Sequence, residues 1–519
     1  METVQTDKQK PVLGVSEEAV EVELVGLNAE SATGPDLLPT RVLKECGKVL
    51  ARPVWMLIML LLQAGIWPSV WMHHWIVPLY KRKEVFNAGN YRGVHLTSQL
   101  SKVVERVLLK QCMPFLKSVC AYGPNQFAYT PERGSRDALA YLTLRWLDAI
   151  ARGMKVGVYC SDVAGAFDKV CSEKLVKKLK AKKLDPSIIR LMISWLRERV
   201  AEVVVEGAKS VKVALQNMVY QGTVWGPTLW NLHFEDARQA INEWLFEEIV
   251  YADDLNAFRG FSKETDNSVL KKCLDSCQEE LHSWGRANRV TFEAKKESKH
   301  VLSLAEAEGE DFKIPGVVYD CRLTMQSTCE KLASDCEWKL KMMLRSRQFH
   351  NTAQMVRLYK AQLLSFVEYR TAAVYHATKE HLAVVDRVQE RFLKNVGISE
   401  EDALMHFGLA PLSTRRDIAM LGMLHRARRR KGPPQLQKLF VKELGNDRLR
   451  ELDLTGSSRV LKRSAFGLVP LYNRLPAELR AQKEVKSFQS GLQDLCKEWV
   501  REGLQSWKNG LCPRGNSIV

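Results

Sequence analysis

The tetrapeptide Tyr251-Ala252-Asp253-Asp254 places two carboxylates side by side near the middle of the chain. Apolar residues dominate the segments on either side of it, at 249–251 and 255–258. Two short apolar strands around an acidic pair predict a β-hairpin with both carboxylates at its tip. Such a tip can hold Mg²⁺, which prefers oxygen ligands and relieves the repulsion between neighbouring carboxylates. An acidic pair is also common in an ordinary solvated turn, so the tetrapeptide alone leaves both interpretations open.

A third carboxylate, Asp162, follows a predicted buried strand at 156–160. A strand that delivers one acid beside a hairpin that delivers two would form a triad able to bind two Mg²⁺ ions. In nucleotidyl transfer, one such ion activates a 3′-hydroxyl and the other neutralises the leaving pyrophosphate. The segment between the acids has room for a helix, a hairpin and a second helix, which predicts a split βαβ sheet with helices on one face.

The elements that must position these acids follow from hydrophobic periodicity and turn residues. Helices are predicted at 37–50, 100–113, 167–180, 227–244 and 269–284, and strands at 76–80, 201–205 and 211–215. From 329 to about 395 the pattern is helical and contains neither Pro nor Gly. This change in composition predicts a domain boundary near residue 325.

The charge balance points to a polyanionic partner. The 519 residues include 77 Lys and Arg against 60 Asp and Glu, a net charge of +17. Nucleic acid is the leading candidate and an acidic membrane surface the second, while a merely basic soluble protein is the third interpretation. The 12 cysteines are scattered without a C-x₂-C pair, which favours a reduced intracellular protein, in the nucleus or the cytoplasm, over a zinc or disulfide protein.

The N-terminal region and one apolar segment bear on targeting. Residues 1–30 are acidic and irregular, without the features of a signal peptide, and we expect a mobile leader there. The most apolar segment, 54–62, is too short to span a bilayer and predicts a buried helix.

A series of further motifs occurs in a fixed order around these acids, and together they make the chain resemble the reverse transcriptases of non-LTR (LINE-type) retrotransposons. The resemblance runs from about residue 31 to about residue 490. The motifs that carry it are Ser31–Pro39, Asn90–Thr97, Gln126–Asp137, Asp162–Asp168, Gln221–Pro227, Tyr251–Asp254, Trp284 with Phe292 and Lys296, Pro315–Val317, Pro411–Arg416, and Tyr472–Pro476 with Phe488.

The resemblance implies an α+β fold of the right-hand polymerase type, with fingers, a palm built on a split βαβ antiparallel sheet, a helical thumb and a basic helical C-terminal extension. The implied domains are the leader at 1–30, fingers and N-terminal extension at 31–155, palm at 156–325, thumb at 326–400 and basic region at 401–519. The reverse transcriptase domain itself would span about 70–325.

The implied activity is that of an RNA-directed DNA polymerase that adds deoxynucleotides to a primer 3′-end. Its partners would be an RNA template, a DNA primer and deoxynucleoside triphosphates, without a membrane. Its cofactors would be two Mg²⁺ ions, with Mn²⁺ as the alternative ion. No segment before the polymerase motifs is long enough for an endonuclease domain, so we expect nicking by a missing part of a polyprotein or by another protein.

The resemblance also assigns roles to single residues. Asp162 and Asp253 would bind both metals, and Asp254 would adjust the metal site, whereas Asp168 is expected to be a helix-start cap. The residues expected near the incoming nucleotide are Lys81 (with Lys83 as its rival), Arg92, Phe167, Gln221, Gly222 and Lys296. Phe167 would exclude a ribose 2′-hydroxyl or else be a core aromatic, and Lys296 would act near the pyrophosphate or else be a solvated lysine. Gly316 would lie in the primer grip.

Some residues depart from the usual motif. They are Tyr220, Trp225, Ala128, Glu293, Glu297 and Pro315. None is an expected metal ligand, but the two glutamates put the motif around Lys296 in doubt. A catalytically silent, RNA-binding descendant of such an enzyme is therefore the alternative function, and a membrane-surface protein that uses the basic tail and segment 54–62 is a second.

The Arg-rich run Arg426–Lys431 is the strongest basic feature of the tail. We expect it to contact nucleic acid through phosphates, which gives salt-dependent and sequence-neutral affinity. A solvated helix face or a nuclear-import signal would have the same composition.

Overall fold

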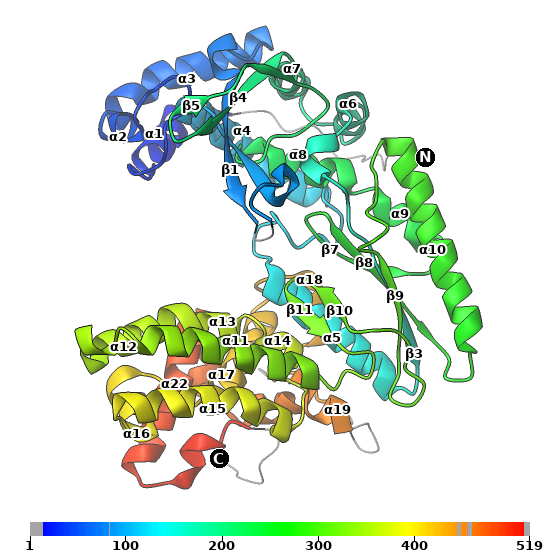
Figure 1. The fold of residues 1–519 in the computed structure, drawn as a ribbon, viewed down its shortest axis with the longest axis vertical. Coiled ribbons are helices and arrows are strands. Elements are labelled where there is room, and N and C mark those ends of the chain that lie inside the picture. The colour runs from blue at the N-terminus through cyan, green and yellow to red at the C-terminus, as the bar shows by residue number, and fades with distance from the viewer. Residues whose placement is uncertain (1–13, 82–83, 444–447, 453, 455–458, 513–519) are drawn as a thin grey trace. The chain divides into compact units, whose positions relative to one another are not determined.

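The computed structural model describes residues 14–81, 84–443, 448–452, 454 and 459–512. The chain folds into two compact units, each assembled from separate segments. The first unit holds residues 1–129, 161–244 and 277–297, and the second unit holds 130–160, 245–276 and 298–519. Both units mix helices with strands (Figure 1). Because their segments alternate along the chain, neither unit follows the predicted boundaries at 155, 325 and 400, which remain predictions about functional subdomains.

The first unit contains a small sheet surrounded by helices. Its strands are β1 (His73–Tyr80), β2 (Tyr91–Leu96), β4 (Arg199–Val205), β5 (Ala208–Lys209) and β6 (Val213–Leu215). Its helices are α1 (Glu17–Val25), α2 (Thr40–Glu45), α3 (Gly47–Ala64), α4 (Gln99–Ser118), α6 (Ser172–Ala181), α7 (Pro186–Leu196), α8 (Trp225–Phe234) and α9 (Ala237–Asn242), with 3₁₀ turns η1 (Ser69–Trp71), η2 (Ala88–Asn90) and η3 (Ala166–Lys169).

The sheet of the first unit has the order β2-β1-β4-β5, with β6 also paired to β4. Strand β1 is antiparallel to β2 and parallel to β4. Three buried tryptophans form part of the core, since the Trp225 ring lies 5.3 Å from that of Trp67 and 5.6 Å from that of Trp195. This aromatic cluster fixes the start of α8, directly after the Gln221-Gly222 segment.

The expectation of a mobile leader over 1–30 was wrong for residues 17–25, which form helix α1. Ser16 caps this helix by accepting a hydrogen bond from the Ala19 N–H. Val20 and Leu24, one helical turn apart, are fully buried. Glu23 also lies 3.2 Å from Arg106 of α4. The helix therefore packs through Val20, Leu24 and the acidic Glu23, whereas Glu18 is exposed.

The predicted buried helix at 54–62 is part of α3, which is longer than the apolar run and buried on one face alone. Val54 and Ile58 are buried, whereas Met56 and Leu60 are 52% and 60% exposed. Among the described residues, α3 is the one helix whose length and composition would allow it to cross a membrane. A single such helix is weak evidence for a membrane span, because buried core helices have the same length and composition. The predicted helix 37–50 is interrupted at Cys46, between α2 and α3.

The second unit contains a four-stranded sheet, a separate two-stranded sheet and a long series of helices. Its strands are β3 (Lys155–Cys160), β7 (Glu247–Tyr251), β8 (Asp254–Phe261), β9 (Ser298–Leu302), β10 (Phe312–Ile314) and β11 (Val317–Tyr319). Its helices are α5 (Ser135–Ala151), α11 (Gln326–Leu344), α12 (Thr352–Tyr359), the π-helix η5 (Lys360–Leu364), α13 (Ser365–Glu368), α14 (Thr371–Val374), α15 (Lys379–Val396), α16 (Glu400–Phe407), α17 (Leu412–Arg428), α18 (Pro434–Leu439), α19 (Arg459–Lys462), α20 (Val469–Arg474), α21 (Ala477–Ala481) and α22 (Val485–Arg501), with 3₁₀ turns η4 (Arg347–Phe349), η6 (Ala465–Leu468) and η7 (Gln505–Lys508). Helix α10 (Asn267–Asn288) contributes residues to both units.

The main sheet of the second unit has the order β7-β8-β3-β9, and every neighbouring pair is antiparallel. All six residues of the central strand β3 are buried. A Cβ added to Gly157 would lie 2.8 Å from Leu270 of α10. On the opposite face, Phe258, which pairs with Val158, packs against Trp146 of α5. The prediction of helices on one face was therefore wrong, because a fully buried central strand needs cover on both sides.

The helical region after residue 325 and the basic tail belong to the same compact unit. Arg416 of α17 makes a bidentate ion pair with Asp386 of α15, at 2.6 and 2.7 Å. His425 of α17 stacks on Phe488 of α22 with 4.1 Å between ring centroids. The tail helices thus pack into the helical region as part of its core.

Candidate active site

The hairpin predicted at 249–258 is present as β7 and β8. Tyr251 pairs with Asp254, which leaves Ala252 and Asp253 as the two turn residues. Ala252 adopts a φ of +61°, a conformation that non-glycine residues rarely take and that costs free energy unless its surroundings enforce it. Asp253 and Asp254 are both half-buried. The hairpin therefore places the acidic pair at a tight, strained tip, as the sequence predicts.

Asp254 is also close to the end of β3. Burial raises the pKa of the Cys160 thiol to about 12, and the negative charge of Asp254 contributes to that rise. Cys160 is the last residue of β3 and pairs with Asn256 of β8. Within the second unit, the acidic tip is thus fixed against the end of the strand that leads along the chain to Asp162.

Asp162 belongs to the first unit, where the segment around it pairs with the segment that precedes Lys296. The Glu293 N–H donates to the carbonyl of Asp162 at 2.8 Å, and the Ala164 N–H donates to the carbonyl of Thr291 at 2.8 Å. The Lys296 ammonium lies 2.8 Å from Oδ2 of Asp162, although the lysine side chain is 59% exposed. Lys296 is therefore not purely solvated, because its ammonium forms an ion pair with the Asp162 carboxylate.

The unusual glutamates around Lys296 have distinct surroundings. Glu297 is buried and accepts hydrogen bonds from His282 at 2.9 Å and from Gln278 at 2.6 Å. His282 in turn stacks on Phe292 with 5.1 Å between ring centroids. Glu293 is partly exposed and lies 3.8 Å from Lys296. The segment around Lys296 is therefore held in place despite its departures from the usual motif, because Glu297 anchors it to α10.

Phe167 lies in the 3₁₀ turn η3 and is 8% exposed. Its ring stacks on Trp230 at 5.9 Å and meets Tyr129 edge-on at 6.4 Å. These contacts are those of a core aromatic, and a role against the nucleotide sugar remains a prediction. The expected helix at 167–180 is broken here, since η3 and α6 are separate.

Asp168 was wrongly predicted to cap a helix, because it lies inside η3 and the N-cap of α6 is Cys171. Burial raises the pKa of Asp168, and the ammonium of Lys81 offsets part of that rise. Lys81 therefore lies close to the η3 turn.

The Gln221-Gly222 segment is fixed against strand β2. The carbonyl of Gln221 accepts a hydrogen bond from the His95 N–H at 2.7 Å. Gly222 has a φ of +102°, and a Cβ at this position would lie 2.6 Å from the carbonyl oxygen of His95. The structure thus explains the glycine by its close approach to protein backbone, whereas an approach to nucleotide or template remains a prediction.

Glu105 is a positioning residue that our sequence reasoning did not single out. Its fully buried carboxylate accepts hydrogen bonds from the backbone N–H groups of Val224 at 2.8 Å and Trp225 at 3.0 Å, and from the Trp195 indole at 3.2 Å. Burial raises the pKa of this carboxyl, and the Trp225 N–H opposes the rise. A glutamate among Val103, Val104 and Val107 on the apolar face of α4 was the signal that could have revealed it.

Tyr220, which replaces a usual proline, lies in a buried polar cluster next to this segment. Its ring contacts His74, His95 and the guanidinium of Arg199 at 4.8, 5.5 and 4.9 Å. Burial, together with the positive charge of Arg199, lowers the pKa of His95 to about 4. The cluster therefore holds neutral histidines beside a buried arginine, in the core of the first unit.

Two of the expected triphosphate contacts lie at the β1–β2 hairpin. Lys81 directly follows β1, and its N–H donates to the carbonyl of Asn90 at 2.8 Å. Arg92 pairs with Leu79 in the strand register and is exposed, as is Lys81. The rival Lys83 lies outside the described residues.

Gly316 occupies the turn between β10 and β11 with a φ of +77°. The preceding carbonyl, that of Pro315, accepts a hydrogen bond from the Tyr369 hydroxyl at 2.9 Å. The predicted hairpin is present, and its contact with primer stays a prediction.

The acids divide between the units, with Asp162 in the first and Asp253 and Asp254 in the second. Within the part of the chain that the structure describes, no group of three or more His, Cys, Asp or Glu side chains forms a preassembled metal site. The donor chemistry of these partly exposed aspartates nevertheless fits a hard cation such as Mg²⁺, which binds carboxylate oxygens and keeps several waters.

Residues 80–318 match the family described as reverse transcriptase (RNA-dependent DNA polymerase). Residues 80–318 of the chain are therefore similar to reverse transcriptase domains.

The curated relatives specify the type of element. The chain is 25% identical over 407 residues to the RNA-directed DNA polymerase from mobile element jockey of Drosophila melanogaster, a match that covers 74% of this chain and 44% of that protein. The jockey polymerase of Drosophila funebris is 24% identical over 418 residues, which is 76% of this chain and 45% of the relative. The chain is thus homologous to the polymerases of a non-LTR, LINE-type element, and it spans less than half the length of these relatives.

A solved structure of apo telomerase from Candida tropicalis is also similar. It is 12% identical, with a TM-score of 0.37, and the match covers 49% of this chain and 55% of the telomerase chain. A TM-score this low does not establish a shared fold.

Proposed function

We propose that the chain is an RNA-directed DNA polymerase that adds deoxynucleotides to a primer 3′-end. The observation that carries the proposal is the strained β7–β8 tip with its acidic pair, inside a segment that matches the reverse transcriptase family. The strand register supports it. Asp254 precedes Asn256 by two residues, and Asn256 pairs with Cys160, the last residue of β3.

The proposed fold is a right-hand polymerase, with fingers at 31–155, palm at 156–325, thumb at 326–400 and a basic helical extension at 401–519. The antiparallel β7-β8-β3-β9 sheet supports the palm assignment, since a central strand flanked by a hairpin can present acids at one edge. The helices α11 to α15 support the thumb assignment.

The residues proposed to hold two Mg²⁺ ions, or Mn²⁺, are Asp162 and Asp253, with Asp254 adjusting the site. Bound there, the metals would activate the primer hydroxyl and neutralise the pyrophosphate. Lys296, which already faces Asp162, balances the negative charge of this carboxylate and can donate a proton toward the leaving group. Its side chain is 59% exposed, so acceptors other than Asp162 can reach it.

The remaining contacts position the nucleotide and primer. Lys81 and Arg92 would bind the triphosphate, for which exposed cations are suited. Phe167 would exclude a ribose 2′-hydroxyl, Gln221 and Gly222 would support the base pair, and the hairpin at Gly316 would hold the primer. The proposed partners are RNA template, DNA primer and deoxynucleoside triphosphates, and the proposed location is intracellular, in the nucleus or cytoplasm.

The rival function is a silent RNA binder descended from such an enzyme. The presence of Asp162, Asp253 and Asp254 favours catalysis, because a pure binder has no need of a strained acidic tip. Primer extension on an RNA template with Mg²⁺ separates the two functions. Template-dependent lengthening of the primer supports the polymerase, and retention of the RNA without any lengthening supports the binder.

A further inference from the structure

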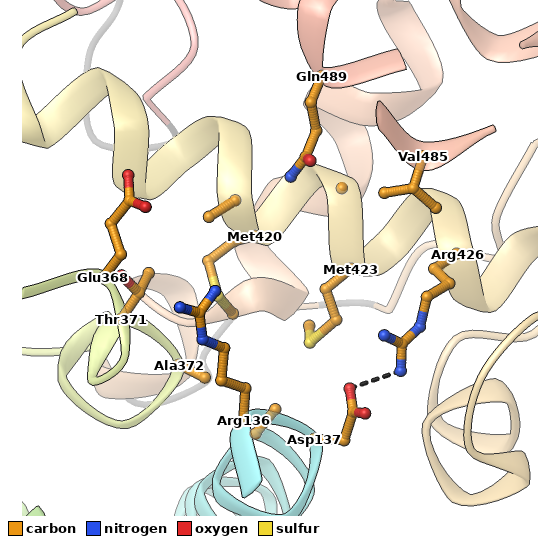
Figure 2. A pocket seen from close by; sticks show the side chains of 13 residues that line it. Arg136, Asp137, Glu368, Thr371, Ala372, Met420, Met423, Arg426, Val485 and Gln489 are labelled. Carbon is orange, nitrogen blue, oxygen red and sulfur yellow. Dashed lines mark hydrogen bonds and ion pairs between the residues drawn. The ribbon is translucent and has the colours of Figure 1, made fainter. Parts of the chain in front are cut away.

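The basic run Arg426–Lys431 ends helix α17, and two of its arginines are structural. Arg426 points to Asp137 at the start of α5 and forms an ion pair of 2.5 Å (Figure 2). Arg428 is 6% exposed and donates to the carbonyl of Arg480, in α21, at 2.6 Å. These side chains attach α17 to its neighbours, so they cannot serve an external ligand without loss of those bonds.

The rest of the run lines a hollow of about 420 Å³, which we call the basic hollow. Its wall comes from the end of α17, the segment after α18 and the segment before α22. The lining residues are Arg428, Arg429, Arg430, Lys431, Lys442, Lys483 and Glu484. Among the described residues, six cationic side chains therefore share this concave surface with a single carboxylate.

The charges in the basic hollow are not balanced internally. Lys431 lies 2.8 Å from Glu484, and this ion pair engages the one carboxylate among the lining residues that the structure describes. The side chains of Arg429, Arg430 and Lys483 make no hydrogen bond or ion pair with any residue in the described part of the chain. Like charges at this density repel, and a polyanion relieves that repulsion.

The composition of the lining selects among polyanions. The described lining contains no aromatic or large aliphatic side chain, so it offers neither a stacking platform for bases nor an apolar group to insert into lipid. What it offers is a curved row of guanidinium and ammonium groups, which bind phosphate oxygens. A phosphodiester backbone in the hollow meets this chemistry without any demand on base sequence.

We propose that the basic hollow binds the phosphate backbone of single-stranded nucleic acid, at a site outside the reverse transcriptase domain at 80–318. RNA and DNA share this backbone chemistry. On the proposed polymerase function, the strand bound in the hollow would be the part of the template RNA that extends beyond the polymerase site. Arg429, Arg430 and Lys483 provide the free cations, while Arg426 and Arg428 hold the wall in place.

The test compares two triple variants of the full chain. R429Q/R430Q/K483Q removes the free cations of the hollow, and K462Q/R474Q/R501Q removes three exposed cations of the same region that do not line it. Fluorescence anisotropy with labelled uridine and thymidine homopolymers, at several salt concentrations, gives the salt dependence of binding. Loss of three phosphate contacts should reduce the slope of log K against log salt by about 2.

We expect the slope of log K against log salt to fall by about 2 in the hollow variant, with both RNA and DNA. We expect the control variant to keep the wild-type slope. Extension of a short preformed primer–template by the hollow variant should stay at the wild-type rate, which separates this proposal from the proposed polymerase function. Unchanged slopes in both variants, or equal losses in both, overturn the proposal. Unchanged nucleic-acid binding with loss of binding to phosphatidylserine vesicles overturns it in favour of a membrane surface.

Discussion

The Lys296 ammonium lies 2.8 Å from Oδ2 of Asp162, although 134 residues separate them in the chain. Backbone pairing between the segments around Asp162 and Phe292 fixes this relationship, and Glu297 anchors the lysine segment to α10. A cation held at the first acid of the motif is available to balance charge that develops there.

Replacement of Lys296 by alanine should therefore slow single-nucleotide extension by roughly a hundredfold or more, the usual size of a general-acid contribution. K296R should recover part of the rate because it keeps the charge. K295A removes the neighbouring exposed lysine and should extend primers normally. Rapid-quench measurement of extension by the three variants checks this, and a wild-type rate in K296A would show that the lysine has no role in catalysis.

Glu105→Gln should destabilise the first unit by roughly 2–4 kcal/mol, because an amide cannot accept from all three N–H groups that the carboxylate now satisfies. Urea unfolding of the variant and wild type gives the difference. E243Q, at an exposed glutamate after α9, is the control and should unfold like wild type. Equal midpoints for E105Q and wild type would mean that the buried carboxylate does not hold the 221–225 segment.

Gly222→Ala should be far more disruptive than Gly207→Ala. Both glycines have positive φ, at +102° and +86°, but a Cβ at 222 meets the His95 carbonyl at 2.6 Å, whereas a Cβ at 207 meets nothing within 4 Å. We expect a loss of roughly 2–4 kcal/mol at 222 and about 1 kcal/mol at 207. Unfolding free energies of the two variants provide the comparison, and similar losses would argue against the steric explanation.

Acid should destabilise the second unit through His425. Burial lowers the pKa of His425 from 6.5 to about 4 in the folded protein. Its Nε2–H donates to the carbonyl of Gln482, and its Nδ1 accepts from the Tyr472 hydroxyl, so the folded state holds the neutral ring. Between about pH 6.5 and pH 4 the unfolded chain binds the proton and the folded protein does not, so this contribution is complete above pH 6.5 and lost as the pH falls toward 4.

Uptake of one such proton changes the free energy of unfolding by roughly 1.4 kcal/mol per pH unit. The free energy of unfolding of H425Q should therefore fall less steeply between neutral pH and about pH 5 than that of wild type. H406Q, at an exposed histidine, should keep the wild-type slope. Parallel curves for H425Q and wild type would contradict the proton linkage.

The fold elements nearest the acids could be predicted because their signals are local. Alternating or continuous apolar runs bounded by turn residues define β3 and the β7–β8 hairpin, and the Pro- and Gly-free stretch defines α11 to α15. Residues 17–25 were misjudged because the exposed Val22 and Val25 hide the helical spacing of the buried Val20 and Leu24. The cover on both faces of β3 depends on packing between distant segments, which no local pattern records.

The candidate site likewise combines residues that a local motif identifies with contacts that depend on tertiary packing. The motif order identifies Asp162, Asp253 and Asp254, and chemistry suggests their role. The ion pair of Lys296 with Asp162, the support of the 221–225 segment by Glu105 and the cause of the glycine at 222 all arise from tertiary contacts. Tyr220 and Trp225, which depart from the motif, fill the core of the first unit and need no functional explanation.

The central claim is that Asp162 and Asp253 are the metal-binding acids of a template-directed DNA polymerase. The most direct test measures primer extension on an RNA template with Mg²⁺ by wild type, D162N and D253N, with melting curves and template binding measured in parallel. We predict extension by wild type and none by either variant, with folding and nucleic-acid binding largely unchanged. Extension by purified D253N or D162N at a rate close to that of wild type would contradict the account.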